Sequence, residues 1–91
     1  MQYIEAPNPY YPRPRHGPSI FLACGITGCP DWQRDARTSL AGTGLVVLNP
    51  RRSHYDPATG ADEEQVSWEV RHLQLADIVM FAVLALSERV R

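Results

Sequence analysis

Three groups of residues in this sequence have types and spacings that could support chemistry, and the first is a glycine-rich loop. The segment Gly25-Ile26-Thr27-Gly28 follows a short apolar run. Glycine lets a ligand approach the backbone closely, and free N–H groups at the start of a helix attract anions. The segment is neither a GxGxxG fingerprint nor a P-loop, which would need Gly-Lys-Ser or Gly-Lys-Thr. It is either one wall of a ligand site or an ordinary strand-to-helix turn.

The second group, Asn49-Pro50-Arg51-Arg52, follows the next apolar run. Two neighbouring guanidinium groups can clamp a phosphate or a carboxylate through paired hydrogen bonds. The same arginines could instead be solvated, or could pair with Asp56, Glu63 or Glu64. The residue types alone leave both interpretations open.

The third group lies on a predicted helix and consists of Gln65, Trp68, Glu69 and His72. These residues fall within two turns and form a stripe along the helix surface. A carboxylate flanked by an amide and an aromatic ring can hold a nucleobase or a sugar hydroxyl. In the alternative interpretation, Trp68 belongs to the core and Glu69 pairs with an arginine.

The composition excludes several classes of function. A net charge of -1 gives no electrostatic attraction to a nucleic-acid polymer or to a membrane surface. All the basic residues are arginine, so no lysine can act as a nucleophile or form a Schiff base. Cys24 and Cys29 lack the spacing of a zinc motif, and we expect neither a metal site nor a cofactor. The longest apolar run, 78–86, is too short to span a bilayer, and no signal peptide is recognisable. We therefore expect a cytoplasmic protein.

The apolar runs 19–23, 45–48 and 77–86 are typical of strands buried in a parallel sheet. Helical patterns separate them, so the order is β-α-β-α-β and the fold class is α/β. We predict a flavodoxin-like parallel sheet with strand order 2-1-3, in which 19–23 is central. Ligands of such sheets bind beyond the carboxyl ends of the strands, where the strand order reverses.

The first helix is predicted to begin at Pro30, because a proline at the first helical position loses no hydrogen bond. It is predicted to end before Gly42. Trp32, Ala36 and Leu40 recur at four-residue spacing and form its inward stripe.

The second helix has a start signal at Asp62, a good N-cap, with Gln65 three residues later completing a pair similar to a capping box. Val66, Val70 and Leu73 share one face of this helix.

Residues 1–18 are predicted to form a proline-rich arm, because its five prolines should interrupt any helix or strand. The arm either packs loosely on the domain or reaches a neighbouring subunit or a site. The domain itself spans 19–91. In a 2-1-3 sheet the strand 77–86 would be an uncovered edge, so either another chain covers it or the domain is truncated at its C-terminus. We expect a homo-oligomer formed through this edge or through the arm.

Four blocks of sequence, taken in order, resemble the nucleoside 2-deoxyribosyltransferase-like family. They are Phe21–Gln33, Val46–Arg52, Glu64–Glu69 and Ala76–Phe81. The resemblance covers about residues 19 to 82. It implies a flavodoxin-like fold, an oligomer with sites near subunit interfaces, and cleavage of an N-glycosidic bond with transfer of the deoxyribosyl group to another base or to water.

The resemblance also implies roles for individual residues. The loop after the first strand would line a nucleoside pocket, the polar end of the second strand would lie beside it, and Glu69 would serve as an auxiliary carboxylate. The predicted substrate-binding residues are Gly25, Ile26, Thr27, Asn49, Arg51, Arg52, Gln65 and Trp68.

Two departures from the family pattern affect this prediction. Cys24 stands where the family usually has a glycine or another small residue. The family's nucleophilic glutamate lies in a Glu-Leu-Gly-like segment after the third strand, and Glu88 lacks that context. We therefore expect binding of a nucleoside or nucleotide, with weak or absent transfer by this chain alone. The alternatives are a catalytically inactive nucleotide-binding module and an oligomeric assembly unit.

Overall fold

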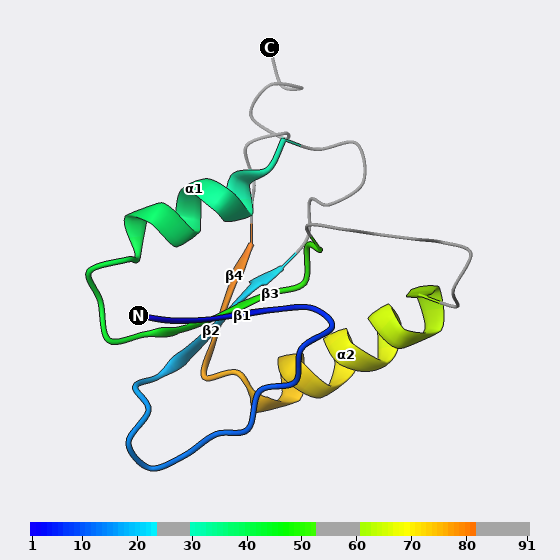
Figure 1. The fold of residues 1–91 in the computed structure, drawn as a ribbon, viewed down its shortest axis with the longest axis horizontal. Coiled ribbons are helices and arrows are strands. Elements are labelled where there is room, and N and C mark those ends of the chain that lie inside the picture. Colours follow the sequence, from blue (N-terminus) through cyan, green and yellow to red (C-terminus); the bar gives the residue numbers. More distant parts are fainter. Residues whose placement is uncertain (24–29, 53–60, 82–91) are drawn as a thin grey trace.

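The computed structural model describes residues 1–23, 30–52 and 61–81, with only the backbone of Ala61 and Asp62. The described part is an α/β fold with a parallel sheet between two helices, which lie on opposite faces of the sheet in Figure 1. Its elements are β1 (Gln2–Glu5), β2 (Ser19–Ala23), α1 (Trp32–Ser39), β3 (Val46–Asn49), α2 (Ala61–Leu75) and β4 (Ile78–Phe81).

The strand order is β1-β3-β2-β4, and every neighbouring pair is parallel. The sheet is therefore not the predicted three-stranded sheet of order 2-1-3, because it contains a fourth strand that was not predicted. The three predicted strands lie in the order β3-β2-β4 within it. The fourth strand, β1, pairs with β3 from Gln2 opposite Val46 to Glu5 opposite Asn49. The predicted α/β class is confirmed, and β2 lies between β3 and β4.

The prediction that residues 1–18 contain no strand is wrong at the start of the arm. The first proline is Pro7, so the prolines cannot interrupt Gln2–Glu5. The amide of Gln2 donates to the carbonyl of Leu45, and the amide of Ala6 donates to the carbonyl of Asn49, which fixes both ends of the strand. The rest of the arm then crosses toward α2 (Figure 1).

Alternating side chains of the strands form two separate apolar layers. Ile20, Leu22 and Val47 point to the α1 face, where the predicted stripe of Trp32, Ala36 and Leu40 packs against them. Phe21, Ala23, Val46 and Leu48 point to the opposite face and pack with Trp68 of α2 and Tyr10 of the arm. The inward stripe predicted for the first helix is thus confirmed.

The helix boundaries differ slightly from the predicted ones. α1 begins at Trp32, with Asp31 as its N-cap, and the Asp31 carboxylate accepts from the amide of Arg34 at 3.1 Å. Pro30 therefore lies just before the helix. α2 begins at Ala61, so Asp62 is inside the helix and is not its N-cap. No helix in the described ranges is long and apolar enough to cross a membrane.

The sheet-facing side of α2 carries Trp68 and His72, both buried. The face formed by Val66, Val70 and Leu73 is exposed instead. The larger rings of Trp68 and His72 remove more surface from water than the valines would, and their polar atoms find partners in the arm.

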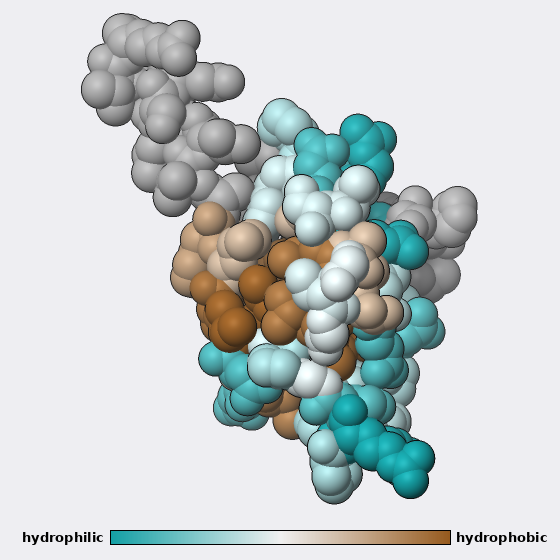
Figure 2. Space-filling view, turned by 90° about the vertical axis from the view of Figure 1, so that its left-hand side faces the viewer, coloured by the Kyte–Doolittle hydropathy of each residue, from teal (hydrophilic) through white to brown (hydrophobic). Residues whose placement is uncertain are grey.

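β4 is held at its start and exposed along its length. The Asp77 carboxylate accepts from the backbone amide of Ser19 at 2.8 Å, and the Asp77 amide donates to the Ser19 carbonyl at 3.1 Å. These bonds set the register in which Ile20 lies opposite Ile78. All four β4 residues are exposed, from 38% at Val79 to 59% at Phe81, and Figure 2 shows hydrophobic side chains gathered on one face of the molecule. The predicted strand continued to Leu86, but residues 82–91 lie outside the described part.

The close approach of the arm to the start of β3 gives a stability prediction. A Cβ added at Gly17 would clash with the carbonyl of Gly44, which is backbone and cannot give way. Gly17→Ala should therefore lower the free energy of unfolding by about 1–3 kcal/mol. Urea unfolding followed by circular dichroism measures this.

The matched control is Gly44→Ala, whose Cβ would meet nothing within 4 Å. It should unfold close to the midpoint of the unsubstituted chain. Equal midpoints for the two alanine variants would contradict the proposed contact.

Candidate functional site

The carboxyl end of β3 carries a buried amide, Asn49, that joins three segments. Its Nδ2 donates to the hydroxyl of Tyr3 on β1 at 2.9 Å, and its Oδ1 accepts from the backbone amide of Arg51 at 2.9 Å. Its carbonyl accepts from Ala6 beyond the end of β1. Asn49 is a predicted substrate-binding residue. In the structure, its side chain forms hydrogen bonds within the protein and positions the backbone of Arg51.

Arg51 connects this segment to the start of α1. Its Nη1 donates to the carbonyl of Pro30 at 2.9 Å and to Oε1 of Gln33 at 3.1 Å, and it lies 3.6 Å from the carboxylate of Asp31. Gln33 is completely buried. The guanidinium of Arg51 thus fixes the approach of α1 to the carboxyl end of β3.

Arg52 points the other way, toward α2. Its Nε donates to Oε1 of Gln65 at 2.6 Å, and its Nη1 lies 2.9 Å from the carboxylate of Glu64. The side chain is only 8% exposed. Its Nη2 is buried and has no hydrogen-bond partner in the described part of the chain.

Gln65 extends this hydrogen-bond network to Glu69. Its Nε2 donates to the carbonyl of Pro50 at 2.8 Å and to the Glu69 carboxylate at 3.1 Å. Both side chains are half-buried. Of the predicted site residues, Asn49, Arg51, Arg52, Gln65 and Glu69 are therefore brought together at the carboxyl end of β3. Gly25, Ile26 and Thr27 lie outside the described residues.

Trp68 is turned away from this network and into the core. It is 5% exposed, tilts against Phe21 and stacks on His72 with ring centroids 4.0 Å apart. Its Nε1 donates to the carbonyl of Asn8 at 2.8 Å. This position agrees with the alternative interpretation of the sequence, in which Trp68 belongs to the core.

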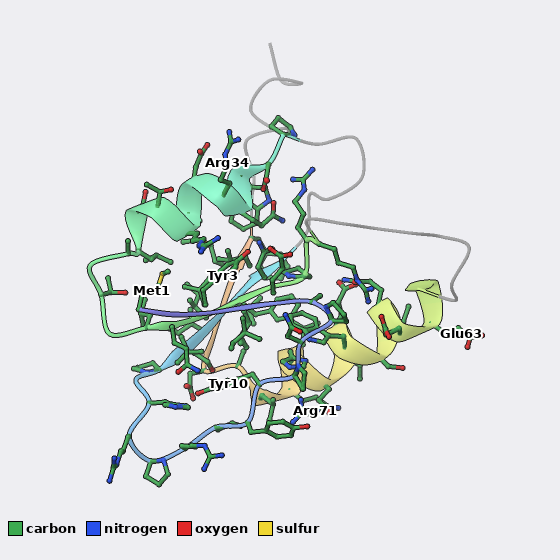
Figure 3. All side chains as sticks on the ribbon, in the orientation of Figure 1. Met1, Tyr3, Tyr10, Arg34, Glu63 and Arg71 are labelled. Carbon is green, nitrogen blue, oxygen red and sulfur yellow. The ribbon has the colours of Figure 1, made fainter. Side chains whose placement is uncertain are left out.

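His72 fastens the arm to α2. Its Nδ1 lies 2.7 Å from the carbonyl of Trp68, to which it donates, and its Nε2 accepts from the backbone amide of Tyr10 at 3.0 Å. Acceptance at Nε2 needs the neutral ring, with its hydrogen on Nδ1. Burial, with a smaller effect from the charge of Arg71, lowers the pKa of His72 below its usual 6.5. Arg71, which is labelled on α2 in Figure 3, donates to the backbone carbonyl of Tyr10 at 3.1 Å.

On the α1 side, a polar cavity of about 210 Å³ lies between β1, α1 and the end of β3. Its lining residues are Tyr3, Glu5, Asp31, Arg34, Arg37, Asn49, Arg51 and Arg52. Tyr3 donates to the Glu5 carboxylate at 2.8 Å, and Arg37 lies over its ring at 3.7 Å. Burial raises the pKa of Tyr3, and the bond to Glu5 adds to this rise.

The neighbours of the Asn49–Arg52 segment that were not predicted from the sequence are Tyr3, Glu5 and the arginines of α1. The available signal for β1 was the pair Tyr3-Ile4 ahead of the first proline, because aromatic and β-branched residues favour strands. In the ranges 1–23, 30–52 and 61–81, no three His, Cys, Asp or Glu side chains gather closely enough to hold a metal ion.

Comparison with known proteins gives one finding on the family. The sequence model of a family described as nucleoside 2-deoxyribosyltransferase like matches residues 17–90. No curated protein matches the chain. The match includes all the residues of the Arg52–Gln65–Glu69 network, whereas β1 lies outside it.

The buried ring of His72 predicts a pH-dependent stability. Because its pKa is lowered on folding, the folded state disfavours the protonated ring. This contribution to stability should be complete above about pH 6.5 and should be lost as the pH falls through the lowered pKa. Thermal unfolding at a series of pH values between about 7.5 and 5 measures the loss.

The variant His72→Gln should show a shallower loss over the same range, because it has no ring to protonate. His16→Gln is the matched control, since His16 contacts the Tyr10 hydroxyl at 2.7 Å but not α2. A pH profile of His72→Gln as steep as that of the unsubstituted chain would refute the role of His72.

Proposed function

Because this chain belongs to the nucleoside 2-deoxyribosyltransferase-like family, we propose that it binds a nucleoside or nucleotide and acts in cleavage of an N-glycosidic bond with deoxyribosyl transfer. The observation that carries the proposal is the hydrogen-bonded chain from Arg52 through Gln65 to Glu69. It lies beyond the carboxyl end of β3, and parallel sheets bind ligands at such ends.

The side chains of this hydrogen-bonded network can bind the hydroxyl groups of a sugar. A half-buried carboxylate such as Glu69 accepts hydrogen bonds from hydroxyl groups, and Gln65 holds it in a fixed orientation. We assign Glu69 an auxiliary role, because covalent glycosyl transfer needs a different carboxylate at the anomeric carbon. Trp68 is proposed to position α2 rather than to contact the ligand, since its indole is buried against Phe21 and His72.

The remaining wall of the site is proposed to come from Gly25, Ile26 and Thr27, which follow β2 in the sequence. Asn49 and Arg51 are proposed to support this site from the β3 side through the bonds described above. We further propose that the complete sheet has the flavodoxin-like arrangement, and that the protein acts in the cytoplasm.

The proposal is tested by titrating the full chain with the four common 2′-deoxynucleosides in a calorimeter. Glu69→Gln removes the negative charge at constant size and should weaken binding about tenfold, because a charge-assisted hydrogen bond is lost. The matched control is Glu63→Gln on the same helix, whose side chain extends into solvent in Figure 3 and is exposed. It should leave the affinity unchanged.

A second measurement separates an enzyme from an inactive binding module. The chain is incubated with deoxyinosine and adenine, and deoxyadenosine is measured by chromatography. Product formed by the unsubstituted chain and lost in Glu69→Gln supports transfer, whereas binding without product supports an inactive nucleotide-binding module. Absence of both binding and product would refute the proposed function.

The exposed apolar residues favour a second candidate function, assembly with another copy of this chain. β4 is the last strand of the sheet in the described part of the chain, and no described strand pairs with its outer side, which is the kind of edge that can pair with another strand. Val79 and Phe81 share the face of the sheet covered by α2, because they lie opposite Phe21 and Ala23 of β2. Two such edges can pair about a two-fold axis, since the same strand serves both copies.

The assembly is tested by light scattering. The unsubstituted chain should be an oligomer, and Val79→Lys should shift it toward the monomer, because a charge on the edge strand opposes pairing. The matched control is Gln74→Lys, an exposed change on α2 outside the apolar residues. A monomeric unsubstituted chain would rule out this candidate.

A further inference from the structure

The polar cavity between β1, α1 and the end of β3 has more positive than negative side chains. Arg34, Arg37, Arg51 and Arg52 line it, against the two carboxylates of Glu5 and Asp31. The carboxylates are already engaged within the protein. Glu5 accepts from the Tyr3 hydroxyl, and Asp31 caps α1 and lies 3.6 Å from Arg51. The side chains that line the cavity therefore have a positive excess, and the carboxylate of Glu64, which lies 2.9 Å from Arg52, is outside this lining.

Two of these arginines have hydrogen-bonding capacity to spare. Arg34 contacts Asp35 only at 3.9 Å, with 76% and 82% of the two side chains exposed, and such a pair contributes little. The side chain of Arg52 is only 8% exposed, yet its buried Nη2 lacks a hydrogen-bond partner in the described residues. A buried donor without a partner is costly, so an acceptor that reaches Arg52 would relieve that cost.

The size and number of donors narrow the kind of ligand. A cavity of about 210 Å³ is smaller than a site for a complete nucleotide, which fills roughly 300 Å³ or more, but it accommodates one charged group. Guanidinium groups from both α1 and the end of β3 offer more donors than the two oxygens of a carboxylate can use. A phosphate monoester presents three acceptor oxygens and a charge near about -2.

Arg52 also links this cavity to the proposed nucleoside site, because its Nε donates to Gln65 while the residue lines the cavity. We propose that the cavity is a phosphate subsite, and that the ligand of this chain is a deoxynucleoside 5′-monophosphate in preference to the unphosphorylated nucleoside. This inference rests on the proposed function for the nucleoside part, whereas the phosphate subsite can be tested separately. β1 contributes to it through Tyr3 and Glu5, so the arm is part of the binding site.

The test compares the four deoxynucleosides with their 5′-monophosphates by calorimetry on the full chain. The monophosphates should bind at least about tenfold more tightly, and Arg34→Gln should remove most of that preference without changing nucleoside affinity. Arg15→Gln is the matched control, because it removes the same charge from an exposed position in the arm outside the cavity lining. Arg52→Lys keeps the charge but removes the fork of donors, and should also reduce the preference.

The outcomes separate the two proposals. Equal affinities for nucleosides and monophosphates, or a preference that survives in Arg34→Gln, overturn the phosphate subsite and leave the proposed function standing. Absence of binding by both ligand classes refutes the proposed function. In that case, binding of inorganic phosphate is measured by ³¹P NMR. Binding that is weakened in Arg34→Gln but not in Arg15→Gln supports the phosphate subsite. Equal binding by the unsubstituted chain and both variants overturns the phosphate subsite.

Discussion

The buried polar end of β3 is the constraint on which the rest of the described structure depends. A buried amide or guanidinium must have hydrogen-bond partners, because leaving one unpaired costs about 1–3 kcal/mol. Asn49 meets this requirement with Tyr3 on β1, and Arg51 meets it with Pro30 and Gln33 at the start of α1. Arg52 takes its partners from α2. Three residues of the segment Asn49–Arg52 thereby hold together one edge strand and both helices.

The two faces of the sheet are covered by different kinds of side chain. The α1 face is covered by a conventional apolar stripe, with Trp32, Ala36 and Leu40 on Ile20, Leu22 and Val47. The α2 face is covered by Trp68 and His72, whose polar atoms are satisfied by the returning arm. The arm is therefore part of the core, since Ala6 and Tyr10 are buried with the strands. A proline-rich segment can have this role because polar atoms of α2 supply the partners its backbone lacks.

The candidate site at the carboxyl end of β3 is polar, whereas the edge of the sheet formed by β4 is apolar. Arg52 and the carbonyl of Pro50 bind Gln65 from the β3 side, and Gln65 in turn donates to the carboxylate of Glu69. Val66, Val70 and Leu73 are on the exposed side of α2, and β4 is exposed beyond β2. Ligand binding and assembly are therefore proposed for different parts of the surface, which makes them separable by mutation.

The alternation of strands and helices, the inward stripe of α1 and the family could all be predicted from the sequence, because they depend on local periodicity and on ordered blocks of residues. The sequence also indicated that Arg52, Gln65 and Glu69 would be neighbours. Three features became visible in the folded chain alone: Gln2–Glu5 joins the sheet, Trp68 and His72 rather than the valines of α2 face inward, and Tyr3 and the arginines of α1 share a cavity with Asn49. These outcomes depend on hydrogen bonds between residues more than forty positions apart, such as Asn49 with Tyr3 and Trp68 with Asn8, and no local pattern in the chain encodes such pairings.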